Sequence, residues 1–372
     1  MQGKLLEQGI GKLGFGFMRL PEIDGVIDIE QVKQMTDLYI ENGYSYFDTA
    51  YGYHGGKSEV AIKTAVIDRH PRDKVRIATK LPLWNIDADY KAIFAEQLAR
   101  TGAGYFDFYL FHGFSLERSR HEKMKEIFDF IKTQKEKGII RHFGFSTHDS
   151  AENMERLIVE HPEFEFVQFQ LNYADWDSDS VQSRKCYEAA RKHHIPIIVM
   201  EPVRGGTLNT LPDEAAALLK GINPGESLAS WAIRYCLSMD GVLTILSGMS
   251  SLEQVRDNIK TFADKRPLSE EEQAAVAKAV EVIRSIDQIP CTDCRYCVEE
   301  CPQKINIPGY LHVANEYKIY RNQTTARRHM GFIQRGGGTP ADCTACGACE
   351  RKCPQHVPVI DAFKDLKSVF FS

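Results

Sequence analysis

Eight of the ten cysteines in this sequence lie in two tight groups near the C-terminus. Both groups have the spacing C-x₂-C-x₂-C-x₃-C-P, with Cys291, Cys294, Cys297 and Cys301 in the first and Cys343, Cys346, Cys349 and Cys353 in the second. The N-terminus has no apolar core long enough for a signal peptide. We therefore expect metal ligation by reduced thiols rather than disulfides.

The spacing of these cysteines is that of the bacterial two-cluster ferredoxin motif, in which the fourth cysteine of each run ligates the other cluster. A tight loop can wrap three thiolates around one face of a cubic cluster, and the fourth must come from elsewhere. We expect two 4Fe–4S clusters, one held by Cys291, Cys294, Cys297 and Cys353 and the other by Cys343, Cys346, Cys349 and Cys301. Structural zinc is the alternative, but zinc motifs rarely carry three evenly spaced cysteines and Cys-Pro twice. The two other cysteines, Cys186 and Cys236, are expected to be buried apolar residues.

A second set of chemically capable residues lies in the first third of the chain. Asp48 and Tyr53 follow one apolar run, Lys80 ends the next run, and His112 ends the one after that. Taken singly, each residue is most simply a structural ion pair or a satisfied core histidine. Four ionisable residues at the ends of three consecutive apolar runs instead indicate one site.

Such residues must be positioned by strands, and the sequence offers eight short apolar runs. These runs begin at Gly14, Tyr44, Val75, Asp107, Ile140, Phe164, Ile195 and Val242. Stretches of helical period separate them, and several end on a glycine where a helix would stop, namely Gly43, Gly102, Gly138 and Gly241. Eight such units over this length predict a (β/α)₈ TIM barrel. A doubly wound open sheet is the alternative, but no G-x-G-x-x-G turn follows the first run.

The length of 372 residues exceeds what one hydrophobic core usually supports, so a second domain is expected. We predict a barrel over residues 1–267, a linking helix over 268–289 and a small ferredoxin-type domain over 290–372. The composition, with 43% hydrophobic residues and a net charge of −5, is typical of a soluble cytoplasmic protein. It gives no indication of nucleic-acid binding or of a membrane span.

The motifs around these ionisable residues resemble those of the aldo-keto reductase superfamily. The segments FDTAYGY from Phe47, TK at Thr79 and FHG from Phe111 are similar to its Asp-Tyr-Lys-His tetrad in order and spacing. GFSTHD, QFQLNY and MEPVRGG fall at the corresponding later strands, so the resemblance covers residues 10–265. Together with the cysteine groups, the chain resembles the branch of that superfamily with a C-terminal ferredoxin module. The resemblance implies an oxidoreductase that interconverts a small-molecule carbonyl and an alcohol with NADPH or NADH.

The tetrad's residue types suit this chemistry. Reduction of a carbonyl leaves an alkoxide that needs a proton, and a free phenol with a pKa of about 10 donates poorly near neutrality. A neighbouring ammonium group favours the phenolate and lowers that pKa. We therefore expect Tyr53 to be the general acid and base, with Lys80 tuning its pKa and Asp48 keeping Lys80 charged. His112 would orient and polarise the carbonyl oxygen.

The resemblance also implies a nicotinamide-binding set. Ser146 and Gln168 would hold the carboxamide, and Met200 would lie near the nicotinamide ring. The segment from Ile245 aligns with the adenosine phosphate site, which would include Gly248, Gln254 and Asn258. Gly248 and Gln254 carry no positive charge that could bind the 2′-phosphate of NADPH. NADH use is therefore as consistent with the sequence as NADPH use. Arg204 and Arg256 are candidates for the missing cation, and Arg19 and Glu201 are candidate ligand contacts at strand ends.

The two halves handle electrons differently, since nicotinamide exchanges a hydride and clusters take single electrons. A flavin could couple them, and Val203–Gly206 lies where barrels bind phosphate, although no flavin motif is visible. Three hypotheses follow. The barrel could be a carbonyl reductase with structural or redox-sensing clusters. The clusters could pass electrons between the barrel and an external carrier. A catalytically idle barrel is the third, and the intact tetrad counts against it.

Overall fold

The computed structural model describes residues 10–179, 181–263, 266–291, 294–334 and 337–371. The chain divides into two compact units. The barrel unit runs to Val203 and resumes over Ser230–Gln273, and the C-terminal unit comprises Arg204–Ala229 and Ala274–Ser372. Within the described ranges, no helix has the length and apolar character needed to span a bilayer.

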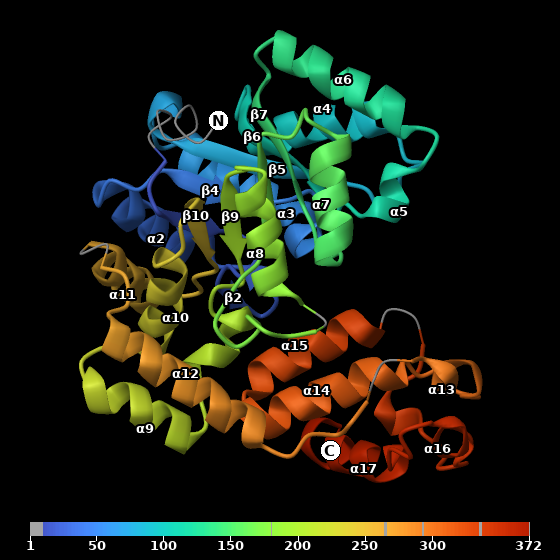
Figure 1. The fold of residues 1–372 in the computed structure, drawn as a ribbon. Coiled ribbons are helices and arrows are strands. Elements are labelled where there is room, and N and C mark those ends of the chain that lie inside the picture. The colour runs from blue at the N-terminus through green and yellow to red at the C-terminus, as the bar shows by residue number, and fades with distance from the viewer. Residues whose placement is uncertain (1–9, 180, 264–265, 292–293, 335–336, 372) are drawn as a thin grey trace. The chain divides into compact units, whose positions relative to one another are not determined.

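Eight parallel strands close into the barrel of the first unit (Figure 1). They are β1 (Leu13–Gly16), β4 (Tyr46–Asp48), β5 (Arg76–Pro82), β6 (Phe106–His112), β7 (Ile140–Ser146), β8 (Phe166–Gln170), β9 (Ile197–Met200) and β10 (Val242–Ser247). Each strand pairs with its neighbours along the chain, and β10 closes the ring on β1, where Gly14 pairs with Leu246. Each of the eight apolar runs therefore contributes one strand, which confirms the predicted (β/α)₈ barrel.

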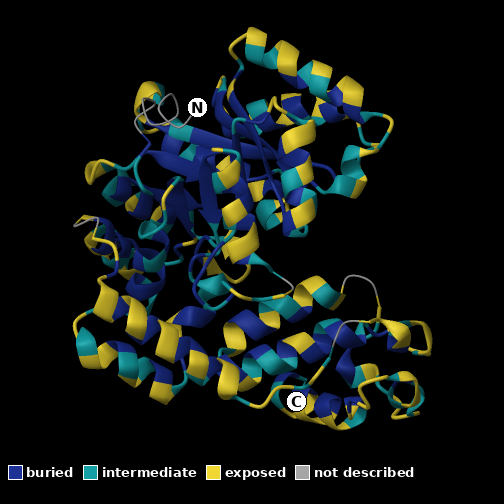
Figure 2. Ribbon diagram, viewed as in Figure 1, coloured by how far each residue is buried: buried dark blue, intermediate teal, exposed yellow. Residues whose placement is uncertain are grey.

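The barrel strands are buried on both faces, as Figure 2 shows in dark blue. Their inner side chains fill the barrel, where Phe108 meets Tyr46 and Phe166 in edge-to-face ring contacts. Their outer side chains pack under the surrounding helices. Near-continuous apolar strands are expected where helices cover a parallel sheet. Gly144 is required in β7, because a Cβ there would lie 2.5 Å from the carbonyl oxygen of Phe166.

Amphipathic helices alternate with the strands and turn exposed faces outward (Figure 2). They are α2 (Ile29–Glu41), α3 (Lys57–Ile62), α4 (Tyr90–Thr101), α5 (Leu116–Ser119), α6 (Met124–Glu136), α7 (Ala151–Glu160), α8 (Ser183–Lys192), α9 (Asp213–Ile222), α10 (Leu228–Leu237), α11 (Leu252–Ala263) and α12 (Glu270–Ser285). The predicted glycine stops are confirmed, since Gly43, Gly102, Gly138 and Gly241 all have positive φ.

The C-terminal unit is helical over its described part. Besides α9 and the greater part of α12, its helices are α13 (Tyr296–Glu299), α14 (Ile307–Tyr320), α15 (Gln323–Ile333), α16 (Ala348–Lys352) and α17 (Val359–Phe370). Tyr310 and Leu311 of α14, Met330 of α15 and Phe363 of α17 form the centre of its core. Cys297 and Cys349 lie at the edge of this core, so the cysteine loops are built onto packed helices.

One feature of the barrel unit was not expected from the sequence. A short antiparallel hairpin, β2 (Glu22–Ile23) with β3 (Val26–Ile27), follows the first barrel strand.

The division into units groups residues Arg204–Ala229 with the C-terminal unit, and it falls inside α12. Contacts with α14 and α15 hold this segment there. Arg204 Nη1 lies 3.8 Å from Glu316 Oε1, and Thr325 Oγ1 donates to the Gly205 carbonyl oxygen at 3.3 Å. The domain bounds 1–267, 268–289 and 290–372 stay a prediction.

Candidate functional site

The structure brings the four tetrad residues together at the C-terminal ends of β4, β5 and β6, which are neighbours in the barrel. Lys80 is fully buried, and its Nζ donates to Asp48 Oδ1 at 2.5 Å and to the Thr49 carbonyl oxygen at 2.8 Å. The same Nζ lies 3.5 Å from Tyr53 Oη. A buried ammonium and its buried carboxylate partner therefore lie directly against a half-buried phenol.

Tyr53 is placed by an unusual turn. His54, Gly55 and Gly56, which follow it, all have positive φ, at 50°, 63° and 90°. A left-handed backbone conformation is strained for a residue other than glycine. The Tyr53 ring meets His112 edge-on at a centroid distance of 5.6 Å. The turn thus directs the phenol toward both Lys80 and His112.

The electrostatics of Tyr53 correct one expectation. Burial raises the pKa of Tyr53 above its ordinary value, and the nearby Lys80 opposes this rise without reversing it. Burial also works against the charge of Lys80, but Asp48 and Tyr53 outweigh it and raise the pKa of Lys80. Lys80 therefore acts on the Tyr53 pKa in the predicted direction, but the net shift is upward, because desolvation is the larger effect. Tyr53 keeps its proton at neutral pH.

His112 is neutral in this site. Burial, followed by the nearby charge of Lys80, lowers the pKa of His112 to about 3. Its Nδ1 is buried and has no hydrogen-bond partner. Trp84 meets the imidazole at a centroid distance of 5.0 Å and is 55% exposed. A neutral imidazole can place a hydrogen bond on a carbonyl oxygen without bringing a second cation beside Lys80.

A buried polar network behind Lys80 was not predicted from the sequence. Gln97 of α4 donates to the Lys80 carbonyl oxygen at 3.0 Å and to Glu59 Oε1 at 3.0 Å. Thr79 also donates to Glu59, and Tyr109 donates to Gln97 Oε1 at 2.6 Å. The network fixes the end of β5 from outside the barrel, so it positions Lys80 through the backbone.

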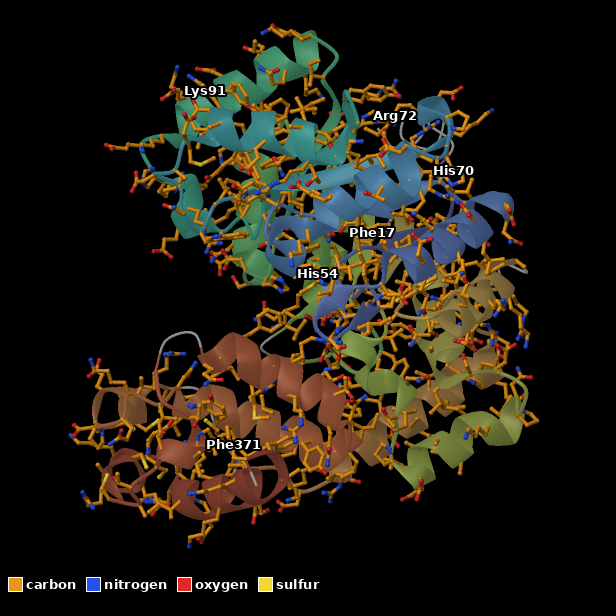
Figure 3. The ribbon with its side chains drawn as sticks, turned by 180° about the vertical axis from the view of Figure 1, so that it is seen from behind. Phe17, His54, His70, Arg72, Lys91 and Phe371 are labelled. Carbon is orange, nitrogen blue, oxygen red and sulfur yellow. The ribbon has the colours of Figure 1, made fainter. Side chains whose placement is uncertain are left out.

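His54, marked in Figure 3, ties the Tyr53 turn to the segment after β1. Its Nε2 accepts from the Leu20 backbone N–H at 3.4 Å, and its Nδ1 lies 2.7 Å from Glu22 Oε1. Both ring nitrogens are engaged when Nδ1 carries the proton, which fixes the tautomer. Two hydrogen bonds thus hold a strained residue directly beside Tyr53.

The residues expected at the nicotinamide lie at the ends of β7, β8 and β9. Ser146 is buried, and its Oγ accepts from the Gly113 N–H at 3.1 Å. Gln168 is also buried, with its Nε2 3.8 Å from Met200 Sδ. Its Oε1 has no partner. An unpaired buried acceptor fits the amide hydrogens of a carboxamide.

The residues expected at the adenosine phosphate have other partners. Gln254 Oε1 accepts from the Ser250 N–H at 2.7 Å, and its own N–H is 3.3 Å from Ser251 Oγ, so it caps α11. Asn258 is buried and donates to Ser247 Oγ at 2.7 Å. Gly248 leaves room for Arg19, whose Cδ would lie 3.0 Å from a Cβ at that position.

The other candidates fall in different places. Arg19 forms an ion pair with Glu201 at 3.5 Å, across the ends of β1 and β9. Arg204 lies in the C-terminal unit, and Arg256 is exposed on α11. Phe114, which follows β6, is fully buried in the aromatic core outside the barrel.

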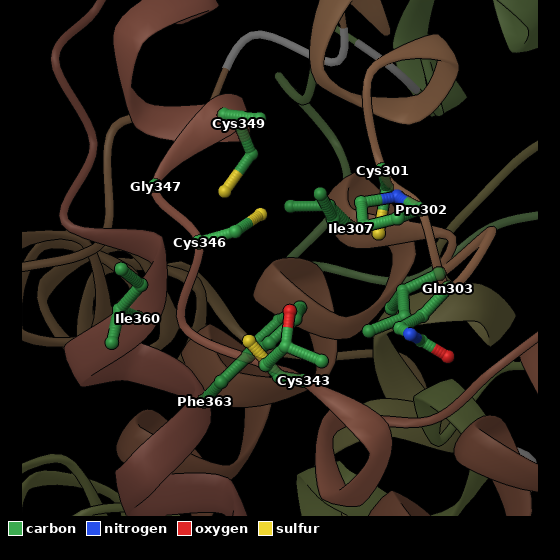
Figure 4. Close-up of a pocket in the computed structure, with 13 residues that line it drawn as sticks. Cys301, Pro302, Gln303, Ile307, Cys343, Cys346, Gly347, Cys349, Ile360 and Phe363 are labelled. Atoms are coloured by element: carbon green, nitrogen blue, oxygen red, sulfur yellow. The ribbon is translucent and has the colours of Figure 1, made fainter.

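The eight cluster cysteines surround two cavities in the C-terminal unit. Cys301, Cys343, Cys346 and Cys349 line the first together with Ile307 and Phe363 (Figure 4). Cys291, Cys294, Cys297 and Cys353 line the second together with Pro308 and Leu311. Each cavity therefore combines three cysteines of one run with the fourth of the other. Four thiols on an apolar wall fit a 4Fe–4S cluster.

A closed parallel barrel with a Lys–Asp–Tyr–His set at the ends of its strands, followed by a domain with two four-cysteine cavities, defines an iron–sulfur oxidoreductase. The sequence profile of the aldo/keto reductase family matches residues 12–281, and that of the 4Fe-4S dicluster domain matches residues 290–357. The chain therefore belongs to the aldo/keto reductase family and carries a C-terminal 4Fe–4S dicluster domain.

Several individual proteins are similar over most of the barrel. The uncharacterized oxidoreductase YqkF of Bacillus subtilis is 24% identical over 72% of this chain and 92% of its own. The NADH-specific methylglyoxal reductase of Escherichia coli is 26% identical over 58% and 78%. The aldo-keto reductase from Klebsiella pneumoniae in complex with NADPH has a TM-score of 0.59 at 23% identity, covering 72% of this chain and 90% of its own. That solved structure shares the barrel fold.

Proposed function

We propose that this protein is a nicotinamide-dependent oxidoreductase that interconverts a small carbonyl compound and its alcohol by hydride transfer. The observation that carries the proposal is the buried contact of Lys80 with both Asp48, at 2.5 Å, and Tyr53 Oη, at 3.5 Å. A structural ion pair would not need a phenol beside it. The phenol lies at the barrel's C-terminal face, where enzymes of this fold carry out their chemistry.

Reduced nicotinamide supplies the hydride when it is bound. Gln168 and Ser146 would hold its carboxamide, because Gln168 Oε1 is a buried acceptor without a partner. Met200 Sδ lies 3.8 Å from Gln168 Nε2. Met200 would therefore provide an apolar contact beside the nicotinamide ring. These three side chains are contributed by successive strand ends, which gives them a rigid support.

Tyr53 donates the proton in the reductive direction. Because burial raises its pKa, the phenol is protonated at neutral pH and acts as an acid. Lys80 favours the phenolate that remains, and Asp48 keeps Lys80 charged. Neutral His112 donates a hydrogen bond to the carbonyl oxygen, which orients it toward Tyr53. In oxidation the Tyr53 phenolate takes the proton of the alcohol.

We propose NADH as the preferred coenzyme. Gln254 is neutral and engaged in capping α11, and position 248 is glycine, so neither offers a cation to a 2′-phosphate. Arg204 contacts Glu316 within the C-terminal unit. The Escherichia coli relative is named an NADH-specific reductase of methylglyoxal, which makes that ketoaldehyde a rational first substrate.

The test is anaerobic oxidation of NADH and NADPH with methylglyoxal and other small carbonyls, by the wild type and by Tyr53→Phe. The proposal predicts carbonyl-dependent NADH oxidation that Tyr53→Phe reduces by about 10²-fold or more, the contribution typical of general acid catalysis. Tyr44→Phe, the same change at the opposite end of β4 from Asp48, is the matched control. Equal rates in Tyr53→Phe and the wild type would refute the mechanism.

The four cysteines that line each cavity are proposed to ligate one cluster. Cys353 would complete the cluster held by the first cysteine run, and Cys301 the cluster held by the second run. A second function is electron exchange with an external carrier. It is favoured by the exposure of Cys294 and Cys346, one in each cavity, since electron transfer needs a short path to the surface. Oxidation of NADH by an added one-electron acceptor in the absence of a carbonyl, with both clusters intact, would support it.

A further inference from the structure

The segment that follows β6 in the barrel unit places an arginine beside the backbone at His112. Arg118 belongs to α5, a short helix that begins four residues after His112. Its Nη1 donates a hydrogen bond to the carbonyl oxygen of Gly113, the residue directly after His112. The N–H of Gly113 donates in turn to Ser146 Oγ at 3.1 Å. The Arg118 guanidinium is therefore held against the backbone that joins the end of β6 to Ser146.

Most of this guanidinium is available to a ligand. A guanidinium carries five N–H donors. Among the described residues, Arg118 uses its guanidinium for the one hydrogen bond to Gly113, and no carboxylate pairs with it. Arg118 is half-buried, so bulk water solvates its charge only in part. A partly desolvated cation with unused donors is suited to binding an anion.

The carboxylates close to the proton-transfer residues already have basic partners. Asp48 and Glu201 are the two carboxylates whose charge acts on the pKa of Tyr53. Asp48 accepts from Lys80 at 2.5 Å, and Glu201 lies 3.5 Å from Arg19. Neither carboxylate therefore neutralises a further cation at this end of the barrel.

The carboxylate that contacts the start of α5 is committed to other hydrogen bonds. Asp149 Oδ2 accepts from the Leu116 N–H at 2.9 Å. Its Oδ1 accepts from the Ser150 N–H and from Asn153 Nδ2, both at 2.8 Å. Asp149 thus fastens the starts of α5 and α7 and leaves the charge of Arg118 unpaired.

The surroundings of His112 are accordingly basic. Burial is the main reason that the pKa of His112 falls to about 3, and the nearby basic groups Lys80, His148 and Arg118 lower it further. A site with this excess of positive charge favours an anionic ligand over a neutral one of the same shape.

We propose that Arg118 binds a carboxylate group of the substrate, so that the carbonyl compound reduced in this barrel is an oxo acid. Tyr53 and His112 would act on its carbonyl oxygen, and Arg118 would hold the other end of the molecule. The planar guanidinium fork matches a carboxylate in shape and charge. The inference rests on the proposed function for the reaction, and on the contacts of Arg118 for the anion site.

The test compares oxo acids with their uncharged esters. Glyoxylate, pyruvate and succinic semialdehyde, and the methyl ester of each, are assayed anaerobically with the cluster-loaded full chain and reduced nicotinamide. The proteins are the wild type, Arg118→Gln and the matched control Arg120→Gln. Arg120 lies at the end of the same helix, but it pairs with Glu160 and its side chain is 55% exposed.

We expect the wild type to favour at least one acid over its ester. Arg118→Gln should raise the KM of that acid about tenfold to a hundredfold, as loss of a hydrogen bond to a charged group does, and leave the KM of the ester unchanged. Arg120→Gln should match the wild type for both. Added salt should raise the KM of the acid in the wild type but not in Arg118→Gln, because salt screens only the charged contact.

A purely structural Arg118 would give a different pattern. Loss of its hydrogen bond to Gly113 would then displace His112 and slow the acid and the ester alike. Equal losses for acid and ester would overturn the inference, and so would an unchanged KM for the acid or a wild type without preference for acids. A preference for glyceraldehyde 3-phosphate over every acid would assign the site to phosphate and also overturn it. Arg118→Lys should keep part of the preference, since it conserves the charge and loses the fork.

A second measurement separates this inference from the proposed function. If the wild type reduces none of these compounds, the proposed function fails, and calorimetric titration with succinate decides the anion site by itself. Binding to the wild type that Arg118→Gln loses would support the site. No binding to the wild type, or equal binding to both proteins, would overturn it.

Discussion

Lys80 Nζ lies 2.5 Å from Asp48 Oδ1, and both side chains are buried at the ends of neighbouring barrel strands. The pair has no access to bulk water that could solvate either charge alone. Each group therefore depends on the other for its ionised state. The same ammonium lies 3.5 Å from Tyr53 Oη. Fold stability and proton transfer are thus coupled at one contact.

Asp48→Asn should be destabilising as well as inactivating. The change leaves the Lys80 ammonium buried without a countercharge, which costs about 3–5 kcal/mol in comparable cases. Denaturant unfolding followed by circular dichroism measures the loss. Asp87→Asn is the matched control, because Asp87 pairs with Lys123 on the surface and its side chain is 75% exposed. The control should stay within about 0.5 kcal/mol of the wild type.

The pH dependence should follow the protonation of Tyr53. Burial raises its pKa above the usual value of about 10. Reduction needs the phenol, so its rate should be flat across neutral pH, whereas oxidation needs the phenolate and should rise about tenfold per pH unit. Lys80→Met removes the charge that opposes the rise in pKa, so its oxidation profile should shift to higher pH. Superimposable pH–rate profiles for Lys80→Met and the wild type would contradict this role.

His54 offers a test of positioning by strain. His54→Gly relieves the left-handed backbone but removes the hydrogen bonds to Leu20 and Glu22. We expect kcat to fall about tenfold from the less ordered Tyr53, while stability changes by no more than about 1–2 kcal/mol. His54→Asn should keep more activity, because Asn tolerates this backbone region and its amide can donate toward Glu22. Full activity in His54→Gly would show that His54 does not position Tyr53.

Part of this site was predictable from the sequence, for a geometric reason. Parallel strands that follow one another place their C-terminal ends side by side, so Asp48, Lys80 and His112 could be expected to meet. The network of Glu59 and Gln97 could not, because polar residues on amphipathic helices look solvated until the helices are packed. The eight barrel strands were predictable for the same kind of reason, since a buried parallel strand leaves an apolar run.

The assignment of Arg204–Ala229 to the C-terminal unit was not predictable. Its anchors, Glu316 and Thr325, lie more than 100 residues further along the chain, as the separation of 120 between Thr325 and Gly205 illustrates. Neither hydrophobic periodicity nor motif spacing predicts a contact between residues so far apart in the sequence. The raised pKa of Tyr53 was missed for a related reason. The effect of Lys80 follows from residue types, whereas the larger effect of burial requires the packed structure.

The cluster assignment makes a prediction about iron. Cys297→Ser should lose the cluster held in its cavity and destabilise the C-terminal unit, because cluster binding and folding are coupled. Iron analysis and limited proteolysis report the two effects. Cys236→Ser is the matched control, since Cys236 is fully buried in the barrel unit away from both cavities. A full complement of iron in Cys297→Ser would refute the assignment.

The most direct test of the central claim is an anaerobic absorption spectrum of the iron-loaded protein, recorded before and after adding NADH, and again after adding methylglyoxal. We expect an unchanged cluster band throughout and loss of NADH absorbance only once the carbonyl is present, slowed about 10²-fold or more in Tyr53→Phe. Bleaching of the cluster band by NADH alone, with the same bleaching in Tyr53→Phe, would contradict the account and make this an electron-transfer protein.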